Sequence, residues 1–198
     1  MTELITLEVS YNLFNQELPA WLGNLTKLAI LGLRGNGWQG EIPTTITNLV
    51  NLRNLFLDFN QLTGDVPANF NALNLTHLFL DDNQLTGTIT SVIGNMNNLL
   101  FVNLSRNQFT GVVPNFVDFA ANIRDVFIRE NLLTFEDILP NLATNLNHLQ
   151  NNSDYSQFNY DSQAKIGVTT SFLFNQGCLL YTSPSPRDQR GSRMPSSA

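Results

Sequence analysis

The chain has 198 residues, 42% of them apolar, and a formal net charge of −6. This length and composition are typical of one soluble domain, and the acidic balance argues against nucleic acid as a partner. No run of 18 apolar residues occurs, so the sequence predicts no membrane-spanning helix.

An asparagine that returns at a nearly fixed interval indicates that the chain is built from repeats. Spacings of 24, 24, 23, 24 and 24 residues separate its six copies, a regularity typical of solenoids. A single coil of a solenoid cannot fold alone, because its apolar side chains are buried only against neighbouring coils. The six residues, which we call the asparagine ladder, are Asn12, Asn36, Asn60, Asn83, Asn107 and Asn131.

The best-preserved copy, Leu49–Leu73, shows what one coil contains. At Leu55–Leu57 the alternation of side chains predicts a short strand with both leucines inward and Phe56 outward. Asn60 then ends the strand, and its amide can hydrogen-bond the turn backbone that the solenoid buries. Gly64 follows, where the chain needs backbone angles that other residues avoid. We expect every coil to follow this path.

The first coil begins close to the start of the chain, since Leu4 stands three residues after Met1. A solenoid normally begins with a polar cap over its first coil. The opening MTELITLEVS also lacks the charged start, apolar middle and cleavage site of a secretory signal. We therefore expect the natural protein to carry sequence upstream of this chain.

The second coil contains a GxGxxG pattern at residues 35–40. Within it Asn36 belongs to the ladder, and Gly40 has the same place in its coil as Gly64. No helix follows on which a phosphate could sit. We interpret the match as coincidental and predict no nucleotide cofactor.

The later coils depart from the repeat in two places. Coil four has one residue fewer before its strand, and it has Thr90 where other coils have proline. Coil six keeps its strand and Asn131, but continues as TFEDILP instead of through glycine and proline. Thr134 with Asp137 three residues later resembles a capping box, which predicts a short helix that closes the array. We expect the array to occupy residues 1–139.

The template LxxLxxLxLxxNxLxGxVPxxFxxL at Leu49–Leu73 resembles the leucine-rich repeat, in the subtype with LxGxIP after the asparagine. The resemblance covers residues 4–133 and extends to arrays of plant-receptor-like or bacterial surface type. It implies an α/β repeat solenoid, a right-handed coil with a parallel β-sheet on the concave face and irregular or 3-10 segments on the convex face. It also implies a surface or secreted protein, with an extracellular or cell-surface location.

Residues 140–177 are predicted to hold the closing helix, a linker and the start of a possible next β domain. The stretch 141–161 is rich in Asn, Gln and Ser and is typical of a loop or linker. Residues 168–174 have strand character. The run LTFEDILPNL followed by FNYDSQAKIG resembles a junction in bacterial surface proteins, where a leucine-rich array passes to a β-sandwich module.

Residues 178–198, CLLYTSPSPRDQRGSRMPSSA, resemble the conceptual translation of a short-read sequencing adapter. We expect a non-native, disordered tail that does not pack against the solenoid, and a natural protein that continues past Gly177. The one cysteine, Cys178, falls in this tail, so the sequence predicts neither a disulfide nor thiol chemistry.

Patterns that carry catalysis are missing from the sequence. It contains no P-loop, no GxSxG nucleophile elbow and no paired Cys/His spacing for a metal. His148 lies in the Asn-rich stretch, and the run Asp81–Asn83 lacks the spacing of a calcium loop. We predict that the chain is not an enzyme and has no metal or cofactor. An enzyme would need a catalytic domain beyond residue 177.

The outward residues of the strands offer the candidate ligand-binding surface. They fall into lanes that run from coil to coil, with steps of about 4.7 to 4.9 Å. Four phenylalanines gather in these lanes, with carboxylates beside them and arginines at the flanks. Clustered exposed aromatic residues are typical of binding anchors. The candidate residues are Phe56, Phe79, Phe101, Phe127, Asp58, Asp81, His77, Arg34 and Arg129.

Three interpretations of the aromatic cluster stay open. The rings could stabilise neighbouring strands as cross-strand pairs, contact a ligand, or have lost a covering domain. For a ligand, an extended peptide or protein segment with apolar and basic side chains fits best. A glycan is the second choice, because sugars stack on aromatic rings but usually on Trp or Tyr.

The predicted function is a non-catalytic module that binds protein or peptide ligands through its concave strand face. One alternative is a structural or adhesive spacer in a multidomain surface protein, without a specific ligand. A further alternative is a glycan-binding fragment or a fragment of a receptor-kinase ectodomain.

Overall fold

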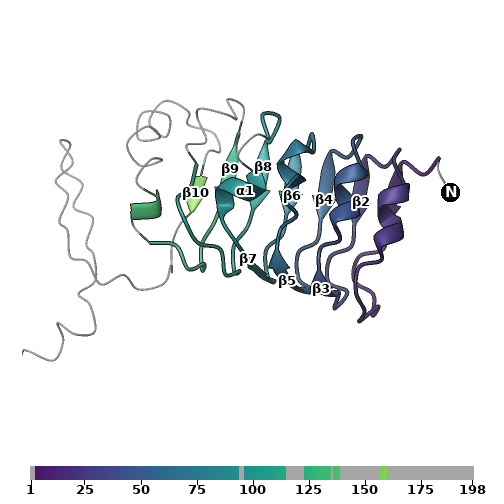
Figure 1. Cartoon of the computed structure of the whole chain (residues 1–198), viewed down its shortest axis with the longest axis horizontal. Helices are drawn as coiled ribbons and strands as arrows, with labels where there is room; N and C mark the ends of the chain where they lie inside the picture. Colours follow the sequence, from purple (N-terminus) through teal and green to yellow (C-terminus); the bar gives the residue numbers. More distant parts are fainter. Residues whose placement is uncertain (1–2, 94–95, 115–122, 135, 139–156, 160–198) are drawn as a thin grey trace, which may run out of the picture. The chain divides into compact units, whose positions relative to one another are not determined.

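The structure, a computed structural model, describes residues 3–93, 96–114, 123–134, 136–138 and 157–159. Each coil contributes one short strand to a parallel sheet and returns along the opposite side of the solenoid (Figure 1). The seven strands of this sheet, in spatial order, are β1 (Thr6–Glu8), β2 (Ile30–Gly32), β4 (Asn54–Phe56), β6 (His77–Phe79), β8 (Phe101–Asn103), β9 (Asp125–Phe127) and β10 (Gln157–Asn159).

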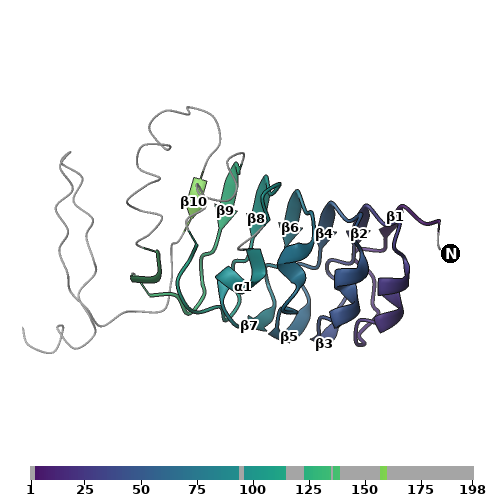
Figure 2. The ribbon, with the colours of Figure 1, turned by 45° about the horizontal axis from the view of Figure 1, so that its top comes forward.

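The return paths form a second, smaller parallel sheet and a row of short helical turns (Figure 2). These turns satisfy backbone groups locally where the chain curves over the side opposite the strands. The expected repeat solenoid with 3-10 segments is confirmed. The small sheet contains β3 (Gln39–Glu41), β5 (Gln61–Asp65) and β7 (Gln84–Thr86), and the turns are η1 (Ala20–Asn24), η2 (Thr44–Asn48), η3 (Phe70–Ala72) and α1 (Ile89–Ile93).

The strands stay in register although coil four is one residue short. Leu55 pairs with Leu31 on one side and with Leu78 on the other, so both the 24-residue and the 23-residue step give aligned strands. The missing residue falls between η3 and β6, because Leu73 and Leu75 are two positions apart where Leu25–Leu28 and Leu49–Leu52 are three apart. The backbone at the end of the turn adjusts accordingly, with ψ of 142° at Leu73 but 56° at Leu25 and 61° at Leu49. Coil length can therefore vary without disturbing the strand face.

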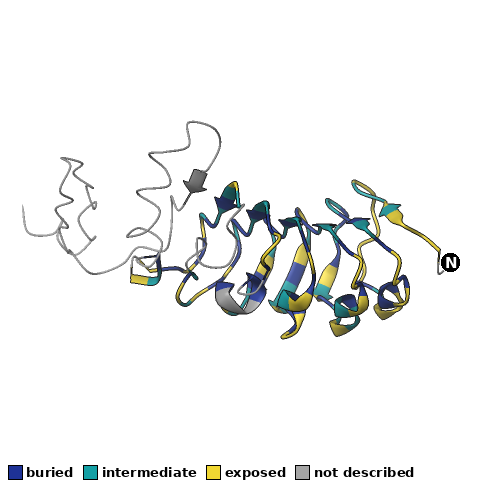
Figure 3. Cartoon of the chain, turned by 90° about the horizontal axis from the view of Figure 1, so that it is seen from above, coloured by how far each residue is buried: buried dark blue, intermediate teal, exposed yellow. Residues whose placement is uncertain are grey.

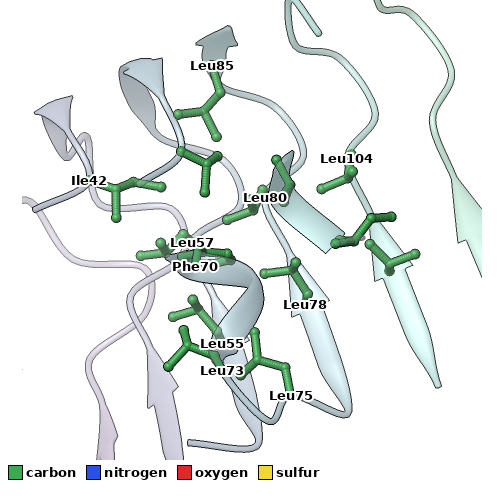
Figure 4. Close-up of a cluster of buried hydrophobic side chains, with 14 of the residues drawn as sticks. Ile42, Leu55, Leu57, Phe70, Leu73, Leu75, Leu78, Leu80, Leu85 and Leu104 are labelled. Atoms are coloured by element: carbon green, nitrogen blue, oxygen red, sulfur yellow. The ribbon is translucent and has the colours of Figure 1, made fainter. Parts of the chain in front are cut away.

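A continuous apolar core fills the solenoid. Buried residues alternate with exposed ones along the ribbon (Figure 3). Leu55 and Leu78, on neighbouring strands, and Phe70 of the return path belong to one cluster of buried side chains (Figure 4). Each such side chain contributes about 1.5 to 3 kcal/mol when fully buried. The expected inward positions are confirmed, since exposure is 0% or 1% for Leu31, Leu55, Leu78 and Val102.

The asparagine ladder joins each coil to the one before it. The Oδ1 atom of Asn60 accepts hydrogen bonds from the backbone N–H groups of Asn36 (3.0 Å) and Trp38 (3.1 Å). Its Nδ2 donates to the carbonyl oxygens of Leu33 (3.1 Å), one coil earlier, and Leu57 (2.8 Å), in its own coil. These bonds satisfy backbone groups that the stack shields from water. The same two-coil pattern occurs at Asn36, Asn83, Asn107 and Asn131.

The residue before each ladder asparagine has a left-handed backbone, with φ between 52° and 61° in all six coils. Only one of the six is glycine, so side chains that normally avoid this region are held there by the stack. At Phe59, for example, the backbone N–H donates to the carbonyl of Asp81 in the next coil at 3.0 Å. The six residues are Tyr11, Gly35, Phe59, Asp82, Arg106 and Glu130.

The end of the array confirms one expectation and corrects another. The backbone N–H of Thr134 donates to Oδ2 of Asp137 (2.7 Å), the N–H of Asp137 donates to Oγ1 of Thr134 (3.3 Å), and residues 136–138 are helical. The prediction of a loop or linker over 141–161 is wrong for residues 157–159, which form β10 beside β9. The predictions for the β-sandwich start and the tail lie outside the described residues.

Replacing Asn60 by alanine tests the ladder. Asn60→Ala should lower the free energy of unfolding by about 3 kcal/mol or more, because two backbone N–H groups lose their acceptor at about 1 to 3 kcal/mol each. Asn12→Ala is the matched control: Asn12 is exposed, and its amide donates to Val9 and Ser10 of its own coil. It should cost less than about 1.5 kcal/mol. Equal losses in denaturant titrations of the two variants would contradict the two-coil role.

Candidate ligand-binding site on the strand face

The seven-stranded sheet aligns its outward residues in three lanes, which together we call the sheet face. Strand pairing fixes the first two lanes, and backbone hydrogen bonds just past the strands fix the third. The predicted alignment of outward residues from coil to coil is confirmed. Lane one is Thr6, Ile30, Asn54, His77, Phe101 and Asp125; lane two is Glu8, Gly32, Phe56, Phe79, Asn103 and Phe127; lane three is Ser10, Arg34, Asp58, Asp81, Ser105 and Arg129.

Two aromatic pairs form the centre of the sheet face. The rings of Phe56 and Phe79 lie 5.4 Å apart at 43°, and those of His77 and Phe101 are stacked at 4.9 Å and 21°. All four side chains are half-buried. Phe127 lies apart from them in lane two, because Asn103 occupies the coil between it and Phe79. The four predicted phenylalanines therefore do not form one patch.

Arg34 lies on the aromatic cluster and does not stand at its flank. Its guanidinium carbon is 4.8 Å from the centre of the Phe56 ring and 5.9 Å from that of Phe79. Its Nε is 3.4 Å from Oδ1 of Asp58. The cation is thus attracted both by the electron-rich ring face and by a carboxylate. Arg129, at the other end of lane three, instead places its Nε 3.8 Å from Oε1 of Glu130.

Lane three contains three consecutive polar side chains that are nearly inaccessible. Exposure is 3% for Asp58, 4% for Asp81 and 1% for Ser105. The expectation that both aspartates are displayed beside the aromatic rings needs correction, because neighbouring side chains cover them. Oδ1 of each aspartate and Oγ of Ser105 have no hydrogen-bond partner among the described residues. Buried polar atoms without a partner are costly and rare.

Burial changes the proton affinity of both carboxyl groups. Burial, reinforced by the nearby charge of Asp58, raises the pKa of Asp81 to about 7. Burial also raises the pKa of Asp58, although Arg34 opposes this shift. Among the ion pairs of the described residues, none includes Asp81. Asp81 therefore has a carboxyl group that changes its protonation near neutral pH and forms no ion pair within the described part of the chain.

The neighbouring cation is committed to another acid. Arg106 donates from Nε and Nη2 to the two carboxylate oxygens of Asp82, both at 2.6 Å. Such two-point contacts are among the stronger ion pairs.

Across the described residues no group of three His, Cys, Asp or Glu side chains could hold a metal ion. In the same part of the chain, no helix has the length and apolar character that crossing a membrane requires.

The family described as Leucine Rich Repeat matches residues 51–73 and 74–96, which are the coils of β4 and β6. The chain is a leucine-rich repeat protein. The stacked asparagines and the parallel strands described above are the physical content of that assignment. A search of curated proteins finds no match.

Among solved structures, this leucine-rich repeat array is similar to ectodomains of plant receptors. The plant peptide hormone receptor RGFR1, in complex with RGF2, is 34% identical over 67% of this chain, with a TM-score of 0.64. The Arabidopsis receptor kinase HAESA, in complex with the peptide hormone IDA and the co-receptor SERK1, is 37% identical over 67%, with a TM-score of 0.61. The chain spans 21% and 22% of those two chains. The ectodomain of the Arabidopsis receptor kinase SOBIR1 is 30% identical over 58% of this chain and 61% of its own, with a TM-score of 0.53.

The raised pKa of Asp81 makes the stability of the array depend on pH. Well below pH 3.8 the carboxyl group is protonated in both the folded and the unfolded state. As the pH rises toward 7, only the unfolded form ionises, because its pKa is near 3.8. The folded state should thereby lose up to about 4 kcal/mol of stability.

The substitution Asp81→Ser, which copies Ser105 of the next coil, should remove this pH-dependent loss. Urea unfolding at pH 4.5 and pH 8 would measure it as a difference between the variant and the original chain. Asp65→Ser, which removes an exposed carboxylate of β5, should keep the dependence. A pH profile that Asp81→Ser leaves unchanged would contradict the raised pKa.

Proposed function

We propose that this leucine-rich repeat module is non-catalytic and binds an extended peptide or protein segment across the sheet face. The observation that carries the proposal is the arrangement of Phe56–Phe79 and His77–Phe101. These pairs offer half-buried ring surface beside the aspartates of lane three. Apolar side chains of a partner would gain most of their binding energy on such rings, since a few buried anchors dominate an interface.

The similar receptors support a peptide as the ligand class. RGFR1 and HAESA are described in complex with RGF2 and with the peptide hormone IDA, and PEPR1 with AtPEP1. An extracellular or cell-surface location belongs to the same proposal, because HAESA and SOBIR1 are solved as ectodomains of receptor kinases. A glycan fits less well, because the rings of the two pairs come from phenylalanine and histidine.

A structural or adhesive spacer is the second candidate. The contact between Phe56 and Phe79 favours it, because a cross-strand aromatic pair stabilises a sheet by about 0.2 to 1 kcal/mol without any ligand. The two functions differ in what happens when the rings are removed. Loss of the rings abolishes capture by a binding module, whereas a spacer loses only a little stability.

Peptide selection on the whole chain tests the proposal. Peptides would be selected from a displayed random library, and their affinity measured for the chain and for the variant with Phe56→Ser, Phe79→Ser and Phe101→Ser. We expect the variant to bind at least about 30-fold more weakly, which corresponds to one anchor of about 2 kcal/mol. Absence of any selected binder, or unchanged affinity in a folded variant, would favour the spacer.

A matched control uses exposed apolar residues outside the sheet face. Trp21→Ser, Val50→Ser and Val112→Ser also remove three large apolar side chains, which are 54%, 65% and 54% exposed. Affinity for the selected peptides should stay within about twofold of the original chain, because separate surface sites act independently. An equal loss in both triple variants would indicate non-specific adsorption of the peptides.

A further inference from the structure

The sheet face already holds one guanidinium group, that of Arg34. The guanidinium of Arg34 lies over the ring of Phe56, at 4.8 Å, and beside the carboxylate of Asp58, at 3.4 Å. A planar cation thus occupies a cradle made of one ring from lane two and one carboxylate from lane three. Guanidinium groups favour such sites, because they stack on rings with their faces and donate from their edges.

The ring and the acid of this cradle recur one coil later, but without an arginine of their own in lane three. Phe79 precedes Asp81 by two residues on its strand, as Phe56 precedes Asp58. In lane three, however, the residue one coil before Asp81 is Asp58, where the first cradle has Arg34. The second cradle therefore repeats the ring and the acid but lacks the arginine that completes the first.

The acceptors of this second cradle are unpartnered. Oδ1 of Asp81 and Oγ of Ser105, in neighbouring coils, are buried and make no hydrogen bond to the described residues. The charged groups that act on Asp81 are Asp58 and Asp82, which are acidic, and Arg106. Arg106 is engaged by Asp82 through two bonds of 2.6 Å, so it forms no ion pair with Asp81 and only weakly offsets the negative charge of an ionised Asp81.

We infer that Phe79, Asp81 and Ser105 form a subsite for the guanidinium group of an arginine side chain in a bound peptide. The inference rests on the proposed function and specifies its ligand. The five N–H donors of a guanidinium lie in one plane. With its face on Phe79, its edge can serve two acceptors whose coils are about 4.7 to 4.9 Å apart.

Entry to the subsite requires a change in Arg34, which at present extends over both rings. Its guanidinium is 5.9 Å from the centre of Phe79 and 4.8 Å from that of Phe56, so the Phe79 contact is the looser one. An incoming arginine displaces Arg34 from Phe79 and leaves it with Phe56 and Asp58. Binding also favours the ionised form of Asp81, so it releases a proton and weakens at acidic pH.

Two small probes test the subsite on the whole chain. N-acetyl-arginine methylamide carries the cation, and N-acetyl-citrulline methylamide has nearly the same shape without the charge. In an NMR titration at pH 8, we expect the arginine probe to shift the amide signals of Phe79, Asp81 and Ser105. It should bind at least tenfold more tightly than the citrulline probe and lower the pH at which the Asp81 carboxyl group titrates.

Variants separate the subsite from a general attraction of cations to an acidic chain. Asp81→Ser should abolish the preference for arginine over citrulline, whereas Asp65→Ser removes an equal charge on β5 and should keep it. Equal binding of the two probes, or a preference that survives Asp81→Ser, overturns the inference. N-acetyl-lysine methylamide binding as tightly as the arginine probe overturns the assignment to a guanidinium.

The outcome is independent of the peptide selection described above. Selected peptides that need the phenylalanines, combined with no Asp81-dependent arginine binding, contradict the subsite alone. Asp81-dependent arginine binding without any selected peptide contradicts the proposed function and leaves a cation site on the sheet face.

Discussion

One amide side chain per coil holds the solenoid together. A coil of 23 or 24 residues turns its backbone several times, and stacking shields part of that backbone from water. At Asn60 the side-chain oxygen accepts from two backbone N–H groups of the preceding coil, and the nitrogen donates to carbonyls of both coils. The ladder thus turns an unfavourable burial of polar backbone into a specific link between neighbours. The strand lanes and everything displayed on them depend on that link.

Much of this architecture could be predicted from the sequence, because its signals are local and repeated. The fixed interval between asparagines gives the coils, and the alternation at Leu55–Leu57 gives the direction of each side chain. Alignment of the lanes then follows from the repeat alone. The pairs Phe56–Phe79 and His77–Phe101 accordingly lie where the sequence predicts neighbours.

Features set by contacts between coils could not be predicted in this way. Asp58 and Asp81 occupy outward positions, yet neighbouring side chains cover them. The alternation of apolar and polar residues along a strand predicts which side a residue faces, but not how far its side chain is buried. The left-handed backbone before each ladder asparagine could not be predicted either, because five of the six residues there are not glycine, which is the usual sign of that conformation. β10 lies in a stretch whose polar composition resembles a linker, and only pairing with β9 makes it a strand.

The sheet face carries a cost in stability, because two of its buried carboxyl groups have an oxygen without a hydrogen-bond partner among the described residues. Coil five has serine at the lane-three position where coils three and four have aspartate, so the fold itself does not require a buried acid there. Binding sites commonly keep groups that lower the stability of the free protein. In this array Asp58 and Asp81 follow Phe56 and Phe79 by two residues, so a partner of opposite charge would find both attraction and apolar contact.

The missing residue before β6 shows that the strand side and the return side of the solenoid tolerate changes in coil length differently. Backbone pairing sets the spacing of the strands, while the segment between η3 and β6 takes up the missing residue. The strands therefore keep an even spacing even where the length of the return path changes. If whole coils were exchanged between such arrays, the outward side chains presented to a partner would shift by complete strand steps and never by a fraction of one.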